Sequence, residues 1–114
     1  MWIPLTFECA TASNPFYVPV PFPCKVSKAR YVCDVSQAAT KTVVIAKTGG
    51  STIISGDLSA TGGTITNGTV STTSAYANQK LAITDTLTIT INLTTGTAGT
   101  VVMWLELDEF QLLH

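Results

Sequence analysis

The residues of this chain that could perform covalent or acid–base catalysis are few. The one histidine, His114, stands at the last position of the 114-residue sequence. A serine, threonine or cysteine nucleophile needs a base within hydrogen-bonding reach, and we expect a terminal residue to be too mobile for that role. Glu106, Asp108 and Glu109 cluster near the same end. Glu106 and Asp108 would share one face of a strand, where they could bind a cation or face solvent. The sequence therefore predicts that the protein is not an enzyme.

The three cysteines, Cys9, Cys24 and Cys33, do not have the spacing of a metal site. They form no CxxC pair and have no partner histidine, so no zinc site is predicted. Their odd number and irregular spacing also argue against a disulfide framework, and we expect reduced thiols that pack as small hydrophobic residues. No glycine-rich loop follows a strand and opens a helix, so no phosphate site is predicted either. We expect no metal and no cofactor.

Charged residues make up only 11% of the sequence and the net charge is −1, whereas an average soluble domain has ~25% charged residues. Such a chain has no electrostatic footprint for nucleic acid or an anionic membrane, and we expect neither partner. A surface poor in charge loses little solvation in a close contact, which favours contact with another protein. The small basic group of Lys25, Lys28 and Arg30 could face solvent or contact an acidic partner.

Within the segment Thr84–Asn92, small polar and aliphatic residues alternate strictly from Thr86 onward. A period of two places one face in water and one in a core, which indicates a β-strand. In the segment 24–35 the alternation slips by one residue at Ser27 and Lys28, so we expect a β-bulge there. Further strands are predicted over 41–47, 51–55 and 100–107, with short ones around 64–73 and one helical turn over 74–81.

These strands, separated by glycine-rich turns, predict an all-β fold: an antiparallel two-sheet sandwich, jelly-roll-like, with an extended N-terminal arm. We expect the arm over residues 1–15, the sandwich over 16–109 and a tail over 110–114. Either face of residues 41–47 could point inward. The residues predicted to point inward are Val26, Tyr31, Cys33, Val43, Ile45, Leu87, Ile89, Ile91, Val101, Met103 and Leu105.

Large aromatic residues are concentrated near the N-terminus, where no local turn or partner strand would bury them. Aromatic anchors outside a core pattern favour contact with another chain, although the arm could instead fold back over one end of the sandwich. Pro19, Pro21 and Pro23 make the following segment an extended edge. The candidate partner-contact residues are Trp2, Ile3, Leu5, Phe7, Phe16 and Tyr17.

Four stretches carry a resemblance to a known family: residues 22–33, the turn 47–51, residues 85–91 and residues 96–105. Together they resemble small β-sandwich structural proteins of tailed bacteriophages, and most closely the capsid decoration, or cement, proteins. The resemblance covers roughly residues 17–107. Thr84 stands where the family usually has a glycine.

This resemblance implies a virion structural protein that is made in the host cytoplasm and binds the outer capsid surface. Its expected partners are the major capsid protein and itself, as a homotrimer. The alternative is a head-fibre or tail module that binds a receptor or glycan. Such a module should carry aromatic and amide side chains on its loops, and the loops 62–67 and 94–99 contain no aromatic residue.

Overall fold

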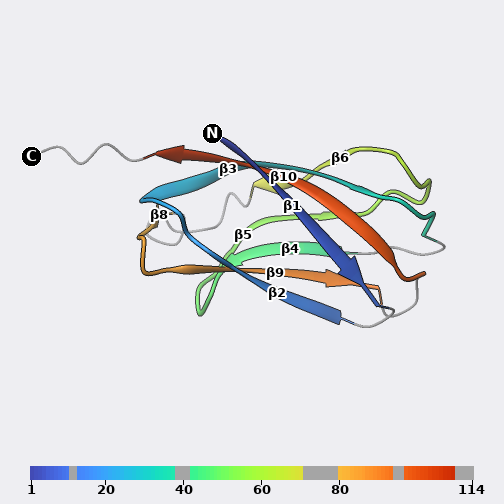
Figure 1. Ribbon diagram of the computed structural model, residues 1–114, viewed down its shortest axis with the longest axis horizontal. Helices are drawn as coiled ribbons and strands as arrows, with labels where there is room; N and C mark the ends of the chain where they lie inside the picture. The colour runs from blue at the N-terminus through green and yellow to red at the C-terminus, as the bar shows by residue number, and fades with distance from the viewer. Residues whose placement is uncertain (11–12, 38–41, 71–79, 94–96, 110–114) are drawn as a thin grey trace, which may run out of the picture.

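The computed structural model describes residues 1–10, 13–37, 42–70, 80–93 and 97–109. These residues form two five-stranded antiparallel sheets and contain no helix. Figure 1 shows the sheets as two layers along the long axis. The first sheet contains β1 (Trp2–Cys9), β10 (Gly99–Glu109), β3 (Cys24–Cys33), β6 (Thr66–Asn67) and β8 (Lys80–Leu81). The second sheet contains β2 (Ser13–Pro19), β9 (Thr86–Asn92), β4 (Thr42–Lys47), β5 (Thr52–Asp57) and β7 (Thr69–Val70).

The order of the strands is that of a jelly roll. In the first sheet β1 pairs with β10, β10 with β3, and β3 with β8; in the second, β2 pairs with β9, β9 with β4, and β4 with β5. The chain thus passes repeatedly from one sheet to the other, and strands adjacent in space are often distant in sequence. The predicted two-sheet sandwich is confirmed.

The predicted bulge in β3 lies at Ser27. Lys28 pairs with Glu106 and Val26 pairs with Leu107, so Ser27 is the extra residue on its strand. Its hydroxyl lies 3.3 Å from the backbone oxygen of Glu106 and 3.2 Å from Oε1 of the same residue. The bulge absorbs the slip in the alternation and keeps Val26 and Tyr31 on the same inward face.

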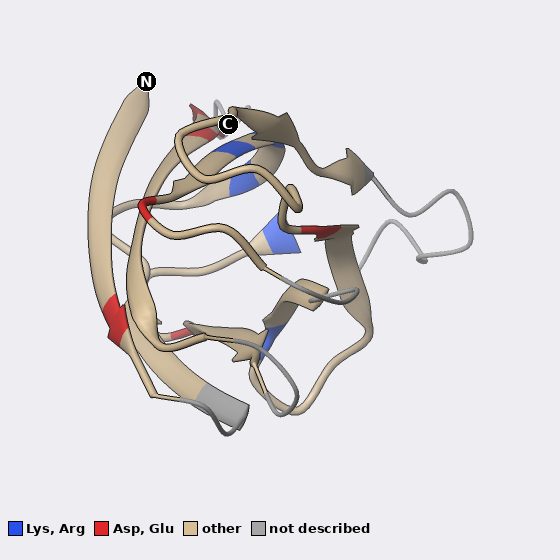
Figure 2. Cartoon of the chain, turned by 90° about the vertical axis from the view of Figure 1, so that its right-hand side faces the viewer, with Lys and Arg blue, Asp and Glu red and all other residues tan. Residues whose placement is uncertain are grey.

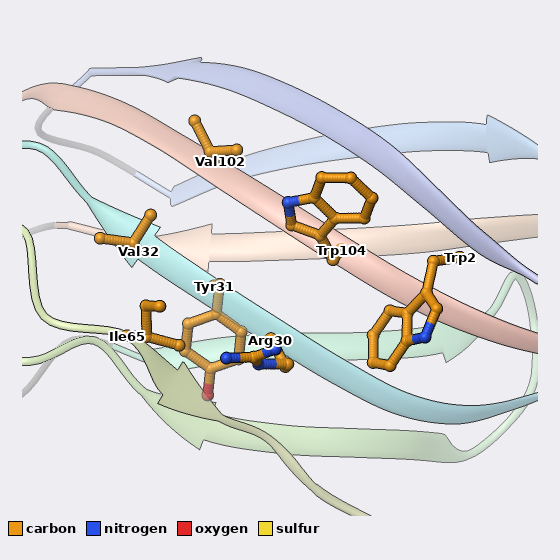
Figure 3. Close-up of a pocket in the computed structure, with 7 residues that line it drawn as sticks. All are labelled: Trp2, Arg30, Tyr31, Val32, Ile65, Val102 and Trp104. Atoms are coloured by element: carbon orange, nitrogen blue, oxygen red, sulfur yellow. The ribbon is translucent and has the colours of Figure 1, made fainter.

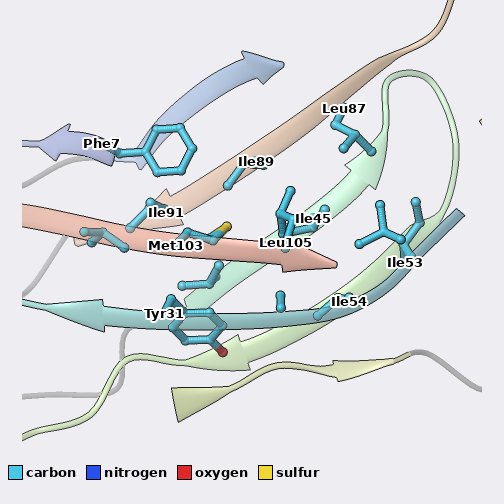
Figure 4. Packing of buried hydrophobic residues seen from close by; sticks show 14 of the residues in the cluster. Phe7, Tyr31, Ile45, Ile53, Ile54, Leu87, Ile89, Ile91, Met103 and Leu105 are labelled. Atoms are coloured by element: carbon cyan, nitrogen blue, oxygen red, sulfur yellow. The ribbon is translucent and has the colours of Figure 1, made fainter. Parts of the chain in front are cut away.

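The core lies between the two sheets, and every residue predicted to point inward is buried there. Figure 4 shows aliphatic side chains of β4, β5 and β9 facing Met103, Leu105 and Tyr31 of the first sheet. In β4 the inward residues are Val43 and Ile45. The sequence leaves open which face of residues 41–47 points inward, and the structure decides this. The alternating Thr and Ile residues of β9 direct each hydroxyl outward and each aliphatic chain into the core.

Gly68 marks the corner where the chain crosses from the first sheet to the second, between β6 and β7. Its N–H donates a 2.9 Å hydrogen bond to the carbonyl oxygen of Ala29. A Cβ at this position would lie 2.5 Å from Cγ2 of Ile54. Only glycine allows the strand to turn this close to the core.

The structure differs from the expectation of a separate N-terminal arm over residues 1–15. Residues 2–9 form β1, which pairs with β10 along its whole length, and residues 13–15 begin β2. Phe7 is only 7% exposed, and its ring packs against Phe16 of β2 with centroids 4.5 Å apart. The expectation failed because the residues of the partner strand, β10, are 90 to 104 positions away in sequence, from Cys9↔Gly99 to Trp2↔Glu106, and leave no local signal.

Two further predictions concern residues outside the described ranges. The helical turn over 74–81 lies outside them except for Lys80 and Leu81, which form strand β8. The tail over 110–114 lies entirely outside them. The predicted edge segment is confirmed as far as Pro19, where β2 ends at one edge of the second sheet, but Pro21 and Pro23 lie in the bend that follows.

Candidate functional site

The described residues contain no cluster of three or more histidine, cysteine or acidic side chains that could hold a metal ion. Glu106 and Asp108 do lie on the outward face of β10, as the sequence predicted. Each faces a lysine on β3: Glu106 is opposite Lys28, and Asp108 is opposite Lys25. Neither pair forms a direct ion pair in the described residues, and the opposite charges interact only as cross-strand neighbours.

The three cysteines are free and buried, as expected. Burial raises the pKa of the Cys9 thiol to about 11, with a smaller contribution from Cys33, and burial also raises the pKa of Cys24. A thiol with a raised pKa is almost entirely protonated at neutral pH, and the thiolate is the nucleophilic form. Cys9 and Cys24 are therefore packing residues.

The candidate partner-contact residues do not form one surface. Trp2 and Tyr17 are exposed, but Trp2 lies on the outer face of the first sheet and Tyr17 on the outer face of the second. The others face the interior: Phe7 is in the core, and Ile3, Leu5 and Phe16 are half-buried against it. The outer face of the first sheet and the outer face of the second sheet are therefore two separate candidate interaction surfaces.

The outer face of the first sheet contains a pocket of about 370 Å³, called here the Trp–Arg pocket. It is lined by Trp2, Arg30, Tyr31, Val32, Ile65, Val102 and Trp104. Three neighbouring strands supply these residues, β1, β10 and β3, together with the segment before β6 (Figure 3). Trp104 is directly opposite Arg30 in the β10–β3 register, so their side chains share one face.

The side chains around the Trp–Arg pocket are unusually open to solvent for their size. Trp104 is 48% exposed, Ile65 56% and Trp2 37%. Tyr31, by contrast, lies at the bottom of the pocket, and its side chain is buried in the core. Within the described residues, the Arg30 guanidinium has no carboxylate partner; the one ion pair there joins Lys47 Nζ and Asp85 Oδ2 at 3.6 Å.

The outer face of the second sheet is rich in hydroxyl groups and almost uncharged. Its outward side chains, called here the threonine face, are Tyr17, Thr42, Val44, Ala46, Ser55, Thr86, Thr88 and Thr90. They stand in rows across the sheet, since Tyr17 is opposite Thr88 and Val44 lies between Thr90 and Ser55. Asp57, opposite Thr42, is the charged residue at its margin. Figure 2 shows how sparsely charges are distributed over the ribbon.

Sequence reasoning missed Trp104 and Ile65 as surface residues. For Trp104 the signal was present: it lies between Met103 and Leu105, both predicted to point inward, so period two directs Trp104 outward. For Ile65 no local signal existed, because its neighbour Thr66 pairs with Tyr31, far away in sequence.

In the part of the chain that the structure describes, no helix is long and apolar enough to cross a bilayer. The chain matches no protein-family model, and comparisons with curated proteins and with solved structures give no significant match.

Proposed function

We propose that this protein is a virion structural protein: a capsid decoration, or cement, protein that binds and stabilises an outer shell through protein–protein contacts. The threonine face is the observation that carries this proposal. It is a broad sheet face that carries many hydroxyl groups and little charge.

The chemistry of the threonine face suits a protein partner. Threonine and serine hydroxyls both donate and accept hydrogen bonds, so they can pair with whichever backbone groups a partner presents. Removing such a face from water costs less than removing a charged one. Tyr17, 65% exposed, adds the kind of aromatic side chain that often dominates interface energies.

The proposed assembly is a homotrimer on the shell, with the major capsid protein as the other partner. Three copies would give three threonine faces, and linked weak contacts bind more tightly than one. Symmetric contacts between copies would also cover strand edges such as that of β1, which has a partner on one side only in the described sheet.

Native mass measured with and without purified shells tests both parts of the proposal. A species of three times the 12.0 kDa chain mass at tens of micromolar, together with co-sedimentation with shells, is expected. A monomer that stays in the supernatant would contradict both the trimer and the shell contact.

A second candidate function, a receptor- or glycan-binding module, is favoured by the Trp–Arg pocket. Two exposed indoles beside a cation are typical of ligand sites, and this pocket is on the face opposite to the threonine face. One protein could therefore use both faces, one toward a shell and one toward the surroundings.

A further inference from the structure

The Trp–Arg pocket has the size of a small-ligand site. Its volume of about 370 Å³ lies within the range of ~300–1,000 Å³ for small-molecule pockets. The pocket therefore has room for one compact group.

The polar groups around the pocket define the chemistry of that group. Trp104 offers an indole N–H and Arg30 offers a guanidinium; both groups donate hydrogen bonds and neither accepts, whereas the indole nitrogen of Trp2 points away from the other lining residues (Figure 3). The other outward-facing lining is apolar: the exposed Ile65 and the half-buried Val32 and Val102. A complementary ligand must bring hydrogen-bond acceptors, negative charge and an apolar face.

We propose that the Trp–Arg pocket binds a carboxylate-bearing sugar residue, such as a uronic acid at the end of an acidic glycan. This inference rests on the second candidate function and names its ligand class. The C–H face of the sugar ring packs against an exposed indole, and a hydroxyl oxygen accepts from the Trp104 indole N–H. The carboxylate pairs with Arg30, whose planar fork matches two carboxylate oxygens.

Three strands position these groups, so the pocket needs no rearrangement to form. Arg30 and Trp104 are cross-strand neighbours, and Trp2 on β1 is opposite Glu106, two residues along β10 from Trp104. Side chains two residues apart along a strand share its face, and diagonal neighbours lie within reach of aromatic side chains. Figure 3 shows Arg30 between Ile65 and Trp2, with Trp104 above them.

The test is calorimetric titration of the full chain with glucuronic acid and, separately, with glucose. The two sugars differ in the carboxylate. For one sugar residue we expect a dissociation constant on the order of 1 mM for glucuronic acid. Glucose should bind about tenfold or more weakly, because it cannot form the charge-assisted bond.

Two matched variants assign the effect to the pocket. Arg30→Gln and Lys28→Gln each remove one positive charge from the outer face of β3, but only Arg30 lines the pocket. Arg30→Gln should abolish the preference for glucuronic acid over glucose, and Lys28→Gln should retain it. Trp104→Ala should bind neither sugar. Because the position is exposed, the melting temperature of this variant should stay close to that of the parent.

Several outcomes would overturn the inference. Equal affinity for the two sugars would show that the pocket does not recognise the carboxylate. If Arg30→Gln and Lys28→Gln weakened the binding of glucuronic acid equally, the attraction would come from the overall positive charge of the face and not from the pocket. No heat with either sugar at about 20 mM, well above the expected dissociation constant, would exclude the site. Tighter binding of an acidic peptide than of glucuronic acid would assign the pocket to a protein. Shell binding, measured separately, is expected to survive Arg30→Gln, so failure of the glycan site leaves the shell proposal standing.

Discussion

The hydroxyl of Tyr31 lies directly against the backbone of Gly56, so that a Cβ at position 56 would overlap the oxygen. Tyr31 belongs to β3 of the first sheet and Gly56 to β5 of the second. The ring therefore spans the sandwich and fixes the distance between the two sheets on this side. The hydroxyl has no hydrogen-bond partner among the described residues.

Gly56→Ala should destabilise the fold by about 1–3 kcal/mol, because overpacking forces the sheets apart or the ring from its rotamer. Combining it with Tyr31→Phe should restore most of that loss, since the variant ring lacks the clashing oxygen. Tyr31→Phe alone should be neutral or slightly stabilising, because it removes an unpaired buried hydroxyl. Urea unfolding of the four proteins measures this cycle; additive effects of the two substitutions would contradict it.

Gln37 is a buried polar residue, and its side chain holds two loops together. Its Nε2 donates to the carbonyl oxygen of Thr97 at 2.9 Å, and its Oε1 accepts from the Thr97 N–H, also at 2.9 Å. Gln37→Ala should lower the free energy of unfolding by about 1–3 kcal/mol, since both backbone groups lose their partner. Thr64→Ala, at an exposed position, is the control and should change it by less than about 0.5 kcal/mol. Similar losses for both would refute the role of Gln37.

Stability should fall as the solution becomes strongly alkaline. Burial raises the pKa of Cys9 from 9.0 to about 11 and that of Tyr31 from 10.0 to about 12, the latter with help from Asp57. The unfolded chain then loses these protons at a lower pH than the folded one. The stabilisation is complete below about pH 9 and declines between about pH 9 and 12. Thermal melts across this range measure it, and Tyr31→Phe should flatten the part above about pH 10; an unchanged profile in that variant would exclude Tyr31.

Much of the fold could be predicted from the sequence because β9 and β10 alternate so regularly. The period of two identified the inward residues and the slip at Ser27, both of which depend only on neighbouring residues. The pairing of β1 with β10 could not be predicted in the same way, because register between distant strands is decided by the assembled core. The Trp–Arg pocket depends on that same pairing. Trp2 joins it only because β1 pairs with β10, so the pocket could not be predicted from the sequence.

The three thiols should be inert in the folded protein. Cys9, Cys24 and Cys33 are buried, and a buried thiol that the reagent cannot reach reacts slowly with disulfide reagents. We expect no reaction with Ellman's reagent in native buffer at neutral pH, and reaction of all three after denaturation in guanidinium chloride. Rapid reaction of any thiol in native buffer would contradict the packing described for it.

The central claim is that the threonine face contacts the shell, and a pair of charge insertions tests it most directly. Thr90→Glu places a carboxylate in the middle of this face, and Thr6→Glu places the same group on the outer face of β1 in the other sheet. The measurement is co-sedimentation of each variant with purified shells, after circular dichroism has shown that both are folded. The account predicts that Thr6→Glu binds as the parent does and that Thr90→Glu stays in the supernatant. Shell binding by Thr90→Glu at the parent's affinity would contradict it.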